Sequence, residues 1–120
     1  MSSLTERFES AVLTLVGDGP VKLRLSRAYT EHLEGIADTE LPAGLREPFG
    51  VLTAAVNRVP AIGGETRVRT NVQKMSPAEA SHHAAAIVKL YAELALQGER
   101  AEPLKVISTG KAPPRYLTRP

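Results

Sequence analysis

The sequence predicts an all-α protein, an antiparallel bundle of four main helices over about residues 4–16, 20–36, 42–58 and 77–97. Three observations support this prediction. Apolar residues recur at intervals of three and four within each range, as on one face of an α-helix. Helix-capping patterns stand at the start of the first and last ranges. The link between the first two helices is only about three residues long, and such short links join antiparallel neighbours.

The first two helices have clear boundary signals. Ser3 and Glu6 have the spacing of a capping box, and Gly17 is suited to end the first helix. Pro20 follows a glycine turn and is suited to the first turn of the second helix, which extends to about Ile36. The apolar faces of these helices comprise Leu4, Phe8, Ala11, Val12, Leu15, Val21, Leu25, Ala28, Tyr29, Leu33 and Ile36.

The third helix carries conflicting local signals. Apolar residues recur at helical spacing from Leu41 to Val56, but Pro48 removes a helical N–H group from the middle of the range. Gly44 and Gly50 further weaken a helix. Two interpretations therefore remain, a kinked helix over about 42–58 or a short turn followed by a helix that begins near Pro48.

The segment 60–75 is predicted to be an extended connection. Pro60 and the Gly63-Gly64 pair break the helix, and polar and apolar residues then alternate with a period of two from Thr66 to Gln73. A lone strand cannot satisfy its backbone groups, which favours an extended loop packed along the bundle. The alternative is a short edge strand that pairs in a dimer.

The fourth helix begins with the strongest local signal in the chain. Ser76 can cap the helix, Pro77 suits its first position and Glu79 can reach back to the cap, while Gly98 is expected to end it. This helix is apolar around most of its circumference, which is typical of a helix buried on more than one side. It is therefore either the central helix of the monomer or part of a subunit interface, which makes a homodimer through residues 77–97 a candidate assembly.

The remaining features define the class of protein. Residues 1–98 are predicted to form one helical bundle domain, and residues 99–120 a basic, proline-containing, flexible tail. The sequence has no cysteine, which excludes disulfides and cysteine zinc sites. No apolar run reaches the roughly 18–20 residues that cross a bilayer, and residues 1–8 do not resemble a signal peptide. We therefore expect a cytoplasmic protein that does not associate with membranes.

The charge distribution suggests one candidate binding surface. Residues 1–57 carry a net charge of −3 and residues 58–120 a net charge of +5. Basic side chains in an extended segment with polar neighbours can contact phosphates, and a tyrosine can stack on a base. The candidate contacts for an anion or nucleic acid are Arg58, Arg67, Arg69, Lys74, Lys111, Arg115, Tyr116 and Arg119. A helix-turn-helix formed by the first two helices would present Lys22, Arg24 and Arg27 instead.

No pattern of residues predicts catalysis. Glu79 and His82 have the Glu-x-x-His spacing of di-iron bundles, but the chain has no second copy of that motif. The glycine turns lack phosphate-loop spacing. We expect no catalytic, cofactor-binding or metal-binding residues. The sequence favours a non-enzymatic protein–protein interaction module with an unknown protein partner, a candidate homodimer; the alternative is a nucleic-acid-associated or regulatory protein that uses the basic 58–74 segment and the C-terminal tail.

Overall fold

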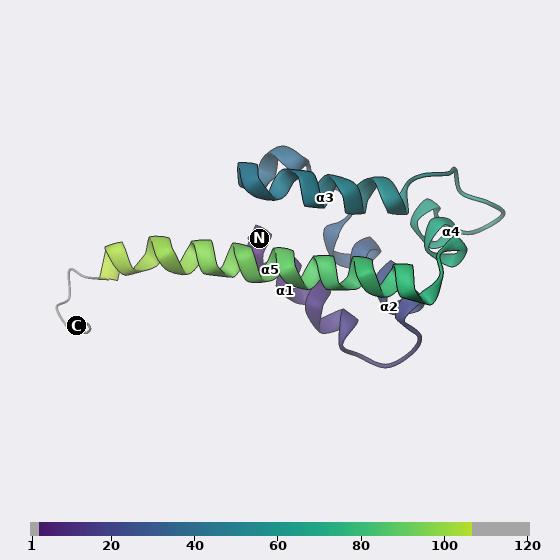
Figure 1. Ribbon diagram of the computed structural model, residues 1–120, viewed down its shortest axis with the longest axis horizontal. Coiled ribbons are helices and arrows are strands. Elements are labelled where there is room, and N and C mark those ends of the chain that lie inside the picture. The colour runs from purple at the N-terminus through teal and green to yellow at the C-terminus, as the bar shows by residue number, and fades with distance from the viewer. Residues whose placement is uncertain (1–2, 107–120) are drawn as a thin grey trace.

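The computed structural model describes residues 3–106, with side chains for residues 3–98. All regular elements in this part of the chain are helical and none is a strand, which confirms the predicted all-α class. It holds five α-helices where four were expected (Figure 1). Their bounds are Leu4–Leu15 (α1), Val21–Ala28 (α2), Ala43–Val56 (α3), Arg67–Lys74 (α4) and Pro77–Val106 (α5). A π-helical turn, η1 (Tyr29–Leu33), follows α2, and a 3-10 turn, η2 (Asp38–Glu40), precedes α3.

The N-terminus of α1 has the predicted capping box. The Ser3 hydroxyl accepts a hydrogen bond from the Glu6 N–H at 3.1 Å, and the Glu6 carboxylate accepts one from the Ser3 N–H at 3.0 Å. Two of the unpaired N–H groups at the start of the helix are thereby satisfied within four residues of sequence. This local closure explains why the start of α1 could be predicted correctly.

The second predicted helix is not uniformly α-helical. After Ala28 it widens into η1, and the Glu34 N–H donates to the Tyr29 carbonyl at 2.8 Å, five residues back. Gly35 then turns the chain with a φ of +89°, a conformation that glycine adopts without strain. The change of helix type preserves burial, since Tyr29 and Leu33 both remain in the core.

The third helix begins before its proline. It starts at Ala43 and continues through Pro48 to Val56, so a helix that begins near Pro48 is ruled out. Arg46 secures its first turns, because Nε donates to the Leu41 carbonyl at 3.0 Å. The inward side of the helix is anchored by Leu45, Phe49, Leu52, Ala55 and Val56.

The prediction of an extended segment over 60–75 is wrong for its second half. Residues 67–74 form α4, with Thr66 as the N-cap, whose hydroxyl accepts from the Arg69 N–H at 3.1 Å. Val68 and Val72 fit either interpretation, because residues four apart share one face of a helix as well as one face of a strand. Both are 1% exposed in the helix. No edge strand is therefore present in this segment to pair in a dimer.

The last helix begins as predicted but does not end at Gly98. The Ser76 hydroxyl accepts from the Glu79 N–H at 3.0 Å, and α5 then continues to Val106. Gly98 lacks the positive φ of a helix-ending glycine, which is found instead at Gly19, Gly35 and Gly63. A glycine inside a helix costs only about 1 kcal/mol relative to alanine, so one such residue need not stop a helix. The predicted tail boundary thus lies within α5, and residues 107–120 lie outside the described part.

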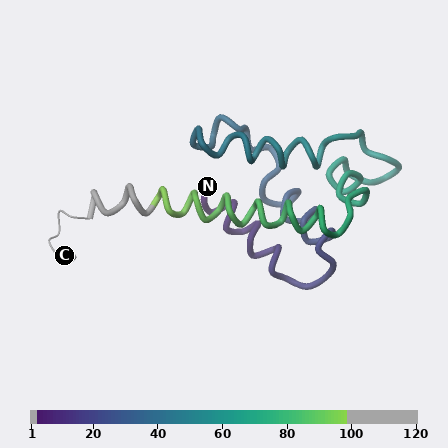
Figure 2. The backbone as a smooth tube through the Cα atoms, in the orientation of Figure 1, coloured from purple at the N-terminus to yellow at the C-terminus, as the bar shows by residue number. Residues whose placement is uncertain are grey.

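The helices pack around α5. It contacts α1, α2 and α3 along its first half, while α4 contacts α2 and α3. The N-terminal end of α1 lies beside the middle of α5 (Figure 2). Across the core, the rings of Phe8 and Phe49 meet edge to face with their centroids 5.8 Å apart. None of the helices described combines the length with the apolar character needed to cross a bilayer.

Gly50 offers a test of the α3 assignment. It is exposed in the middle of α3, and no neighbouring atom lies within 4 Å of the position that a Cβ would occupy. Gly50→Ala is therefore expected to raise the free energy of unfolding by about 0.5–1 kcal/mol, because alanine loses less backbone entropy on folding. Urea titration measures the change.

Gly35→Ala is the matched control for that substitution. Gly35 also has no atom within 4 Å of a Cβ, but its φ of +89° is unfavourable for alanine. This variant should be less stable than the parent. Equal effects of the two substitutions would contradict the helical backbone assigned to Gly50.

Candidate functional site

One face of α5 is not covered by the rest of the described protein. Val88 and Leu96 are 43% and 40% exposed, although both are large and apolar. Ser81, Ala85 and Ala92 are exposed at steps of three and four around them, which places all five on one side of the helix. We call these five residues the α5 face. The buried side of α5 comprises Ala80, His83, Ile87, Leu90 and Leu94.

The α5 face is longer than other exposed apolar features of the described chain. Leu13 and Val16 form an exposed pair at the end of α1, while Val51 and Ile62 are each isolated on other segments. Scattered apolar residues of this kind are normal on protein surfaces. The α5 face instead extends over about four helical turns without a charged residue at any of its positions.

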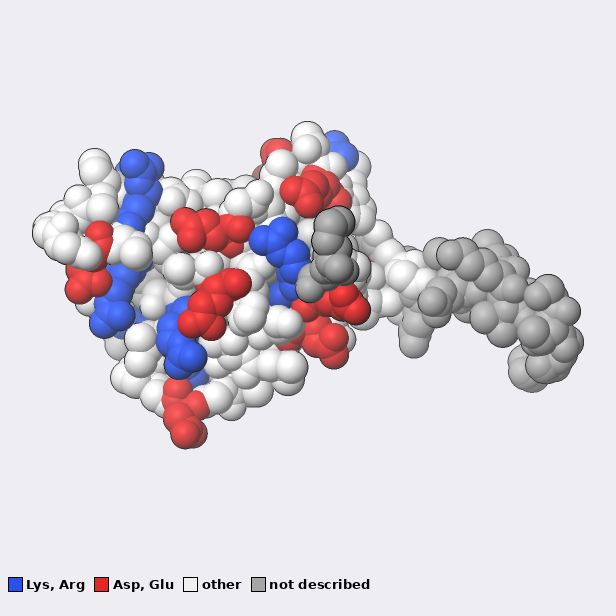
Figure 3. All heavy atoms as spheres, turned by 180° about the vertical axis from the view of Figure 1, so that it is seen from behind, with Lys and Arg blue, Asp and Glu red and all other residues white. Residues whose placement is uncertain are grey.

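The basic residues predicted to contact an anion are only partly brought together. Arg58 follows α3, whereas Arg67, Arg69 and Lys74 lie on α4, and all four are exposed. Arg69 is paired with Glu65, with Nε 3.1 Å from Oε1. The other four candidates, Lys111, Arg115, Tyr116 and Arg119, lie outside the described residues. On the face shown in Figure 3, acidic and basic side chains alternate, and basic groups gather mainly toward the end that carries α4.

Two of the basic side chains that a helix-turn-helix would present, Lys22 and Arg24, instead form hydrogen bonds with backbone carbonyls of this chain. Arg24 donates from Nε to the Gly19 carbonyl at 2.8 Å and from Nη1 to the Leu15 carbonyl. Lys22 donates from Nζ to the Gln73 carbonyl at 2.9 Å. The Leu15 and Gln73 carbonyls lie in the last turns of α1 and α4, where backbone acceptors lack helical partners, and Gly19 lies in the turn between α1 and α2. The two side chains therefore stabilise helix ends and are not free to contact phosphates.

The same use of basic side chains recurs elsewhere. Arg7 donates from Nε to the His32 carbonyl at 3.0 Å and from Nη2 to the Glu34 carbonyl at 3.1 Å. This fastens the end of η1 to α1. Arg27, the third cation of the helix-turn-helix alternative, is paired with Glu31 at 3.4 Å. Sequence patterns cannot distinguish such capping arginines from binding arginines, because their acceptors are distant backbone carbonyls.

A shallow groove lies between α2 and α4. Its volume is about 250 Å³, and it is lined by Pro20, Lys22, Leu23, Ser26, Arg69, Val72 and Gln73. Both of its cations already have partners, the Gln73 carbonyl for Lys22 and the Glu65 carboxylate for Arg69. An anionic ligand would have to displace these contacts. The groove is therefore a weaker candidate site than the α5 face.

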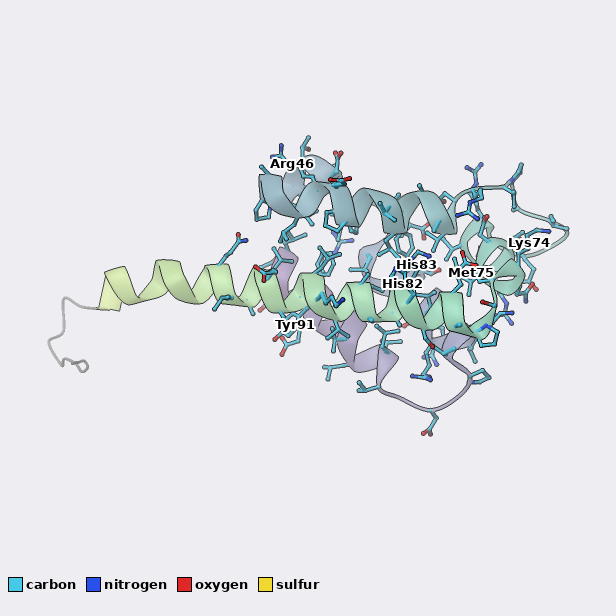
Figure 4. The ribbon with its side chains drawn as sticks, viewed as in Figure 1. Arg46, Lys74, Met75, His82, His83 and Tyr91 are labelled. Atoms are coloured by element: carbon cyan, nitrogen blue, oxygen red, sulfur yellow. The ribbon has the colours of Figure 1, made fainter. Side chains whose placement is uncertain are left out.

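The two adjacent histidines of α5 differ in environment. His83 is 7% exposed and His82 is exposed, with ring centroids 5.5 Å apart. Figure 4 shows both on the N-terminal half of α5, and Lys74 and Met75 at the turn that leads into the helix. Burial lowers the pKa of His83 below its usual value, and His82 and Arg58 lower it further, while Glu79 opposes them. The described residues contain no cluster of three or more potential metal ligands.

The lowered pKa of His83 predicts a pH-dependent stability. Because the folded state favours the neutral ring, its contribution is fully present above the unfolded pKa of about 6.5 and is lost as the pH falls through the lower folded pKa. Urea titrations across this range should show the free energy of unfolding falling below about pH 6.5. His83→Asn should flatten this dependence, whereas His82→Asn, which leaves the burial of His83 in place, should retain most of it. An undiminished dependence in His83→Asn would contradict the assignment.

Comparisons of the chain with protein-family models, with curated proteins and with solved structures find no match.

Proposed function

We propose that this chain is a non-enzymatic protein–protein interaction module that binds its partner through the α5 face. The proposal rests on the exposure of Val88 and Leu96 along a face without charged residues. Burying apolar surface is favourable by roughly 25 cal/mol per Å². A helix that is apolar on its inner side and also along its outer side is typically covered on both. α5 has its inner cover in α1, α2 and α3, and the partner supplies the outer one.

Capture on immobilised protein tests this proposal. The bait carries Val88→Glu and Leu96→Glu, and the control bait carries Leu13→Glu and Val16→Glu, which change an equally apolar exposed pair on α1. The prey is cell extract mixed with added, labelled copies of this chain. A protein, either a cellular one or the labelled chain, should be retained by the parent and the α1 variant and lost from the α5 variant. Identical retention by all three baits would overturn the proposal.

A second candidate function is an association with nucleic acid. It is favoured by Arg67 and Lys74, which are exposed on α4 and have no acidic partner within 4 Å among the described side chains. Arg58 and the basic residues of the C-terminal segment would add further phosphate contacts. The alternating charges of Figure 3 make this candidate the weaker one.

The test of this candidate is the salt dependence of binding. Each phosphate contact releases counterions, so affinity for a short mixed-sequence DNA or RNA should fall steeply with added salt. Arg67→Ala with Lys74→Ala should reduce that slope by about 2. Binding that is absent at low salt, or insensitive to salt, would exclude this function.

We also propose a cytoplasmic location, because a chain without cysteine is compatible with a reducing compartment.

A further inference from the structure

The C-terminal end of α5 extends past the other helices of the described chain (Figure 1). The last buried side chain described on it is Leu94, and the helix itself continues to Val106.

The α5 face has the repeat of a helix that pairs with another helix. Ala85 and Ala92 of the α5 face are seven residues apart, Ala78 precedes the face by three residues at the same interval of seven, and all three are exposed. A seven-residue repeat of apolar positions keeps one seam facing a partner helix. The small alanine side chains permit close approach of the two backbones, while Val88 and Leu96 supply the larger apolar contacts.

The charges beside this seam favour a partner that runs in the opposite direction. Lys89 and Glu93 are exposed along one edge of the α5 face. In an antiparallel pair the same edges of the two helices meet. A two-fold axis near Ala92 therefore places each Lys89 within about two residues, or roughly 3 Å of helix rise, of the level of Glu93 on the other copy. Each pair of copies would thus bring two opposite-charge contacts together, one on each side of the axis.

The length of α5 points to the same axis. The helix extends from Pro77 to Val106, so its midpoint falls between Tyr91 and Ala92. An antiparallel pair centred on Ala92, next to this midpoint, aligns almost the whole of the two helices and sets Val88 of one copy opposite Leu96 of the other. The C-terminal end of each helix then lies along the first half of its counterpart.

We infer that the partner of the α5 face is a second copy of this chain, bound antiparallel about a two-fold axis near Ala92. The inference rests on the proposed function and names its partner. The chain is a homodimer built on paired α5 helices, each of which covers the apolar seam of the other.

Sedimentation velocity tests the assembly. The parent protein should sediment as a dimer at micromolar concentrations. Val88→Glu with Leu96→Glu places four charges in the paired seam of a dimer, and should raise the dissociation constant by more than about 100-fold. Leu13→Glu, at a site that is 64% exposed on α1, should leave the dimer intact. Circular dichroism checks that each variant remains helical. A parent protein that is monomeric throughout this range would overturn the inference.

Disulfide trapping tests the direction and the register. The chain has no cysteine, so each introduced thiol is the only one present. Ala92→Cys should form a disulfide-linked dimer under mild oxidation. An equimolar mixture of Val88→Cys and Leu96→Cys should form the mixed dimer in excess over either symmetric dimer. Efficient symmetric dimers of Val88→Cys and of Leu96→Cys would show a parallel pair and overturn the inference.

These results separate the inference from the proposed function. A monomeric chain whose α5 face still retains a different protein in the capture experiment would refute the homodimer and keep the interaction module. A monomeric chain whose α5 variant captures the same proteins as the parent would refute both.

Discussion

Replacing Phe49 with alanine is expected to lower the free energy of unfolding by about 3–5 kcal/mol, as for other fully buried phenylalanines. Phe49 is 1% exposed and is the central anchor of α3 in the core. Its ring meets that of Phe8, at an interplanar angle of 64°. The substitution removes this contact and leaves a cavity that the surrounding helices can close only in part. Since small domains are stable by about 5–15 kcal/mol, the loss would be a large share of the total.

Urea titration of Phe49→Ala measures this loss, and Val51→Ala is the matched control. Val51 lies two residues away on the same helix but is 57% exposed. Its truncation should change the free energy of unfolding by no more than about 0.5 kcal/mol. A double-mutant cycle with Phe8→Ala isolates the contact between the rings, which should be worth about 0.5–1.5 kcal/mol. Equal and small effects at Phe49 and Val51 would contradict the burial of Phe49 in the core.

The parts of the fold that the sequence predicted well are those fixed by near neighbours. The starts of α1 and α5 follow from hydrogen bonds between residues three apart, Ser3 with Glu6 and Ser76 with Glu79. The first two predicted helices likewise have apolar faces whose periodicity has a single interpretation. In each case the information that determines the structure lies within one turn of the chain.

The segment 67–74 was predicted incorrectly because its decisive contacts are distant. Val68 and Val72 satisfy the spacing of a helix and of a strand equally. The helix is favoured by tertiary hydrogen bonds, in which Thr70 accepts from the Ile62 N–H and Asn71 contacts Val59, twelve residues earlier. Such partners are not visible in a short window of sequence, so the local alternation of polar and apolar residues was misleading.

The α5 face, too, could be predicted only in part, because tertiary contacts decide which side of the helix is covered. The excess of apolar residues in 77–97 was evident from the sequence, and it correctly indicated a helix with apolar surface beyond one face. Which side α1, α2 and α3 cover depends on the tertiary arrangement, and only the structure separates Ile87 and Leu90, both buried, from Val88, which is exposed. The basic residues were less informative, because a capping arginine such as Arg24 has the same sequence signature as a binding one.

Replacing Asn71 with alanine is expected to lower the free energy of unfolding by about 2–3 kcal/mol. Asn71 is 4% exposed and fastens the loop before α4 to the helix. Its Oδ1 accepts from the Val59 N–H at 2.9 Å, and its Nδ2 donates to the Val59 carbonyl at 2.9 Å and to the Arg67 carbonyl at 2.8 Å. Alanine removes all three bonds and leaves the two backbone groups of Val59 without this partner in a half-buried position.

The loss of Asn71 should loosen the backbone around Val59 even under conditions in which the whole protein stays folded. Amide hydrogen exchange at Val59 should accelerate strongly in Asn71→Ala, because that N–H loses its acceptor. The control is Gln73→Ala, at an exposed position of the same helix, which should leave exchange at Val59 unchanged. Asn71→Asp keeps an acceptor for the Val59 N–H but replaces the donor with a carboxylate oxygen beside the Val59 and Arg67 carbonyls, so it should be less stable than the parent. If Asn71→Asp proved as stable as the parent, the two donated bonds would contribute nothing, and the loop would be held by the bonds that the Val59 N–H and the Ile62 N–H donate. If Asn71→Ala left exchange at Val59 unchanged, α4 would not be held in place by this residue, and the tertiary explanation for its helical conformation would fail.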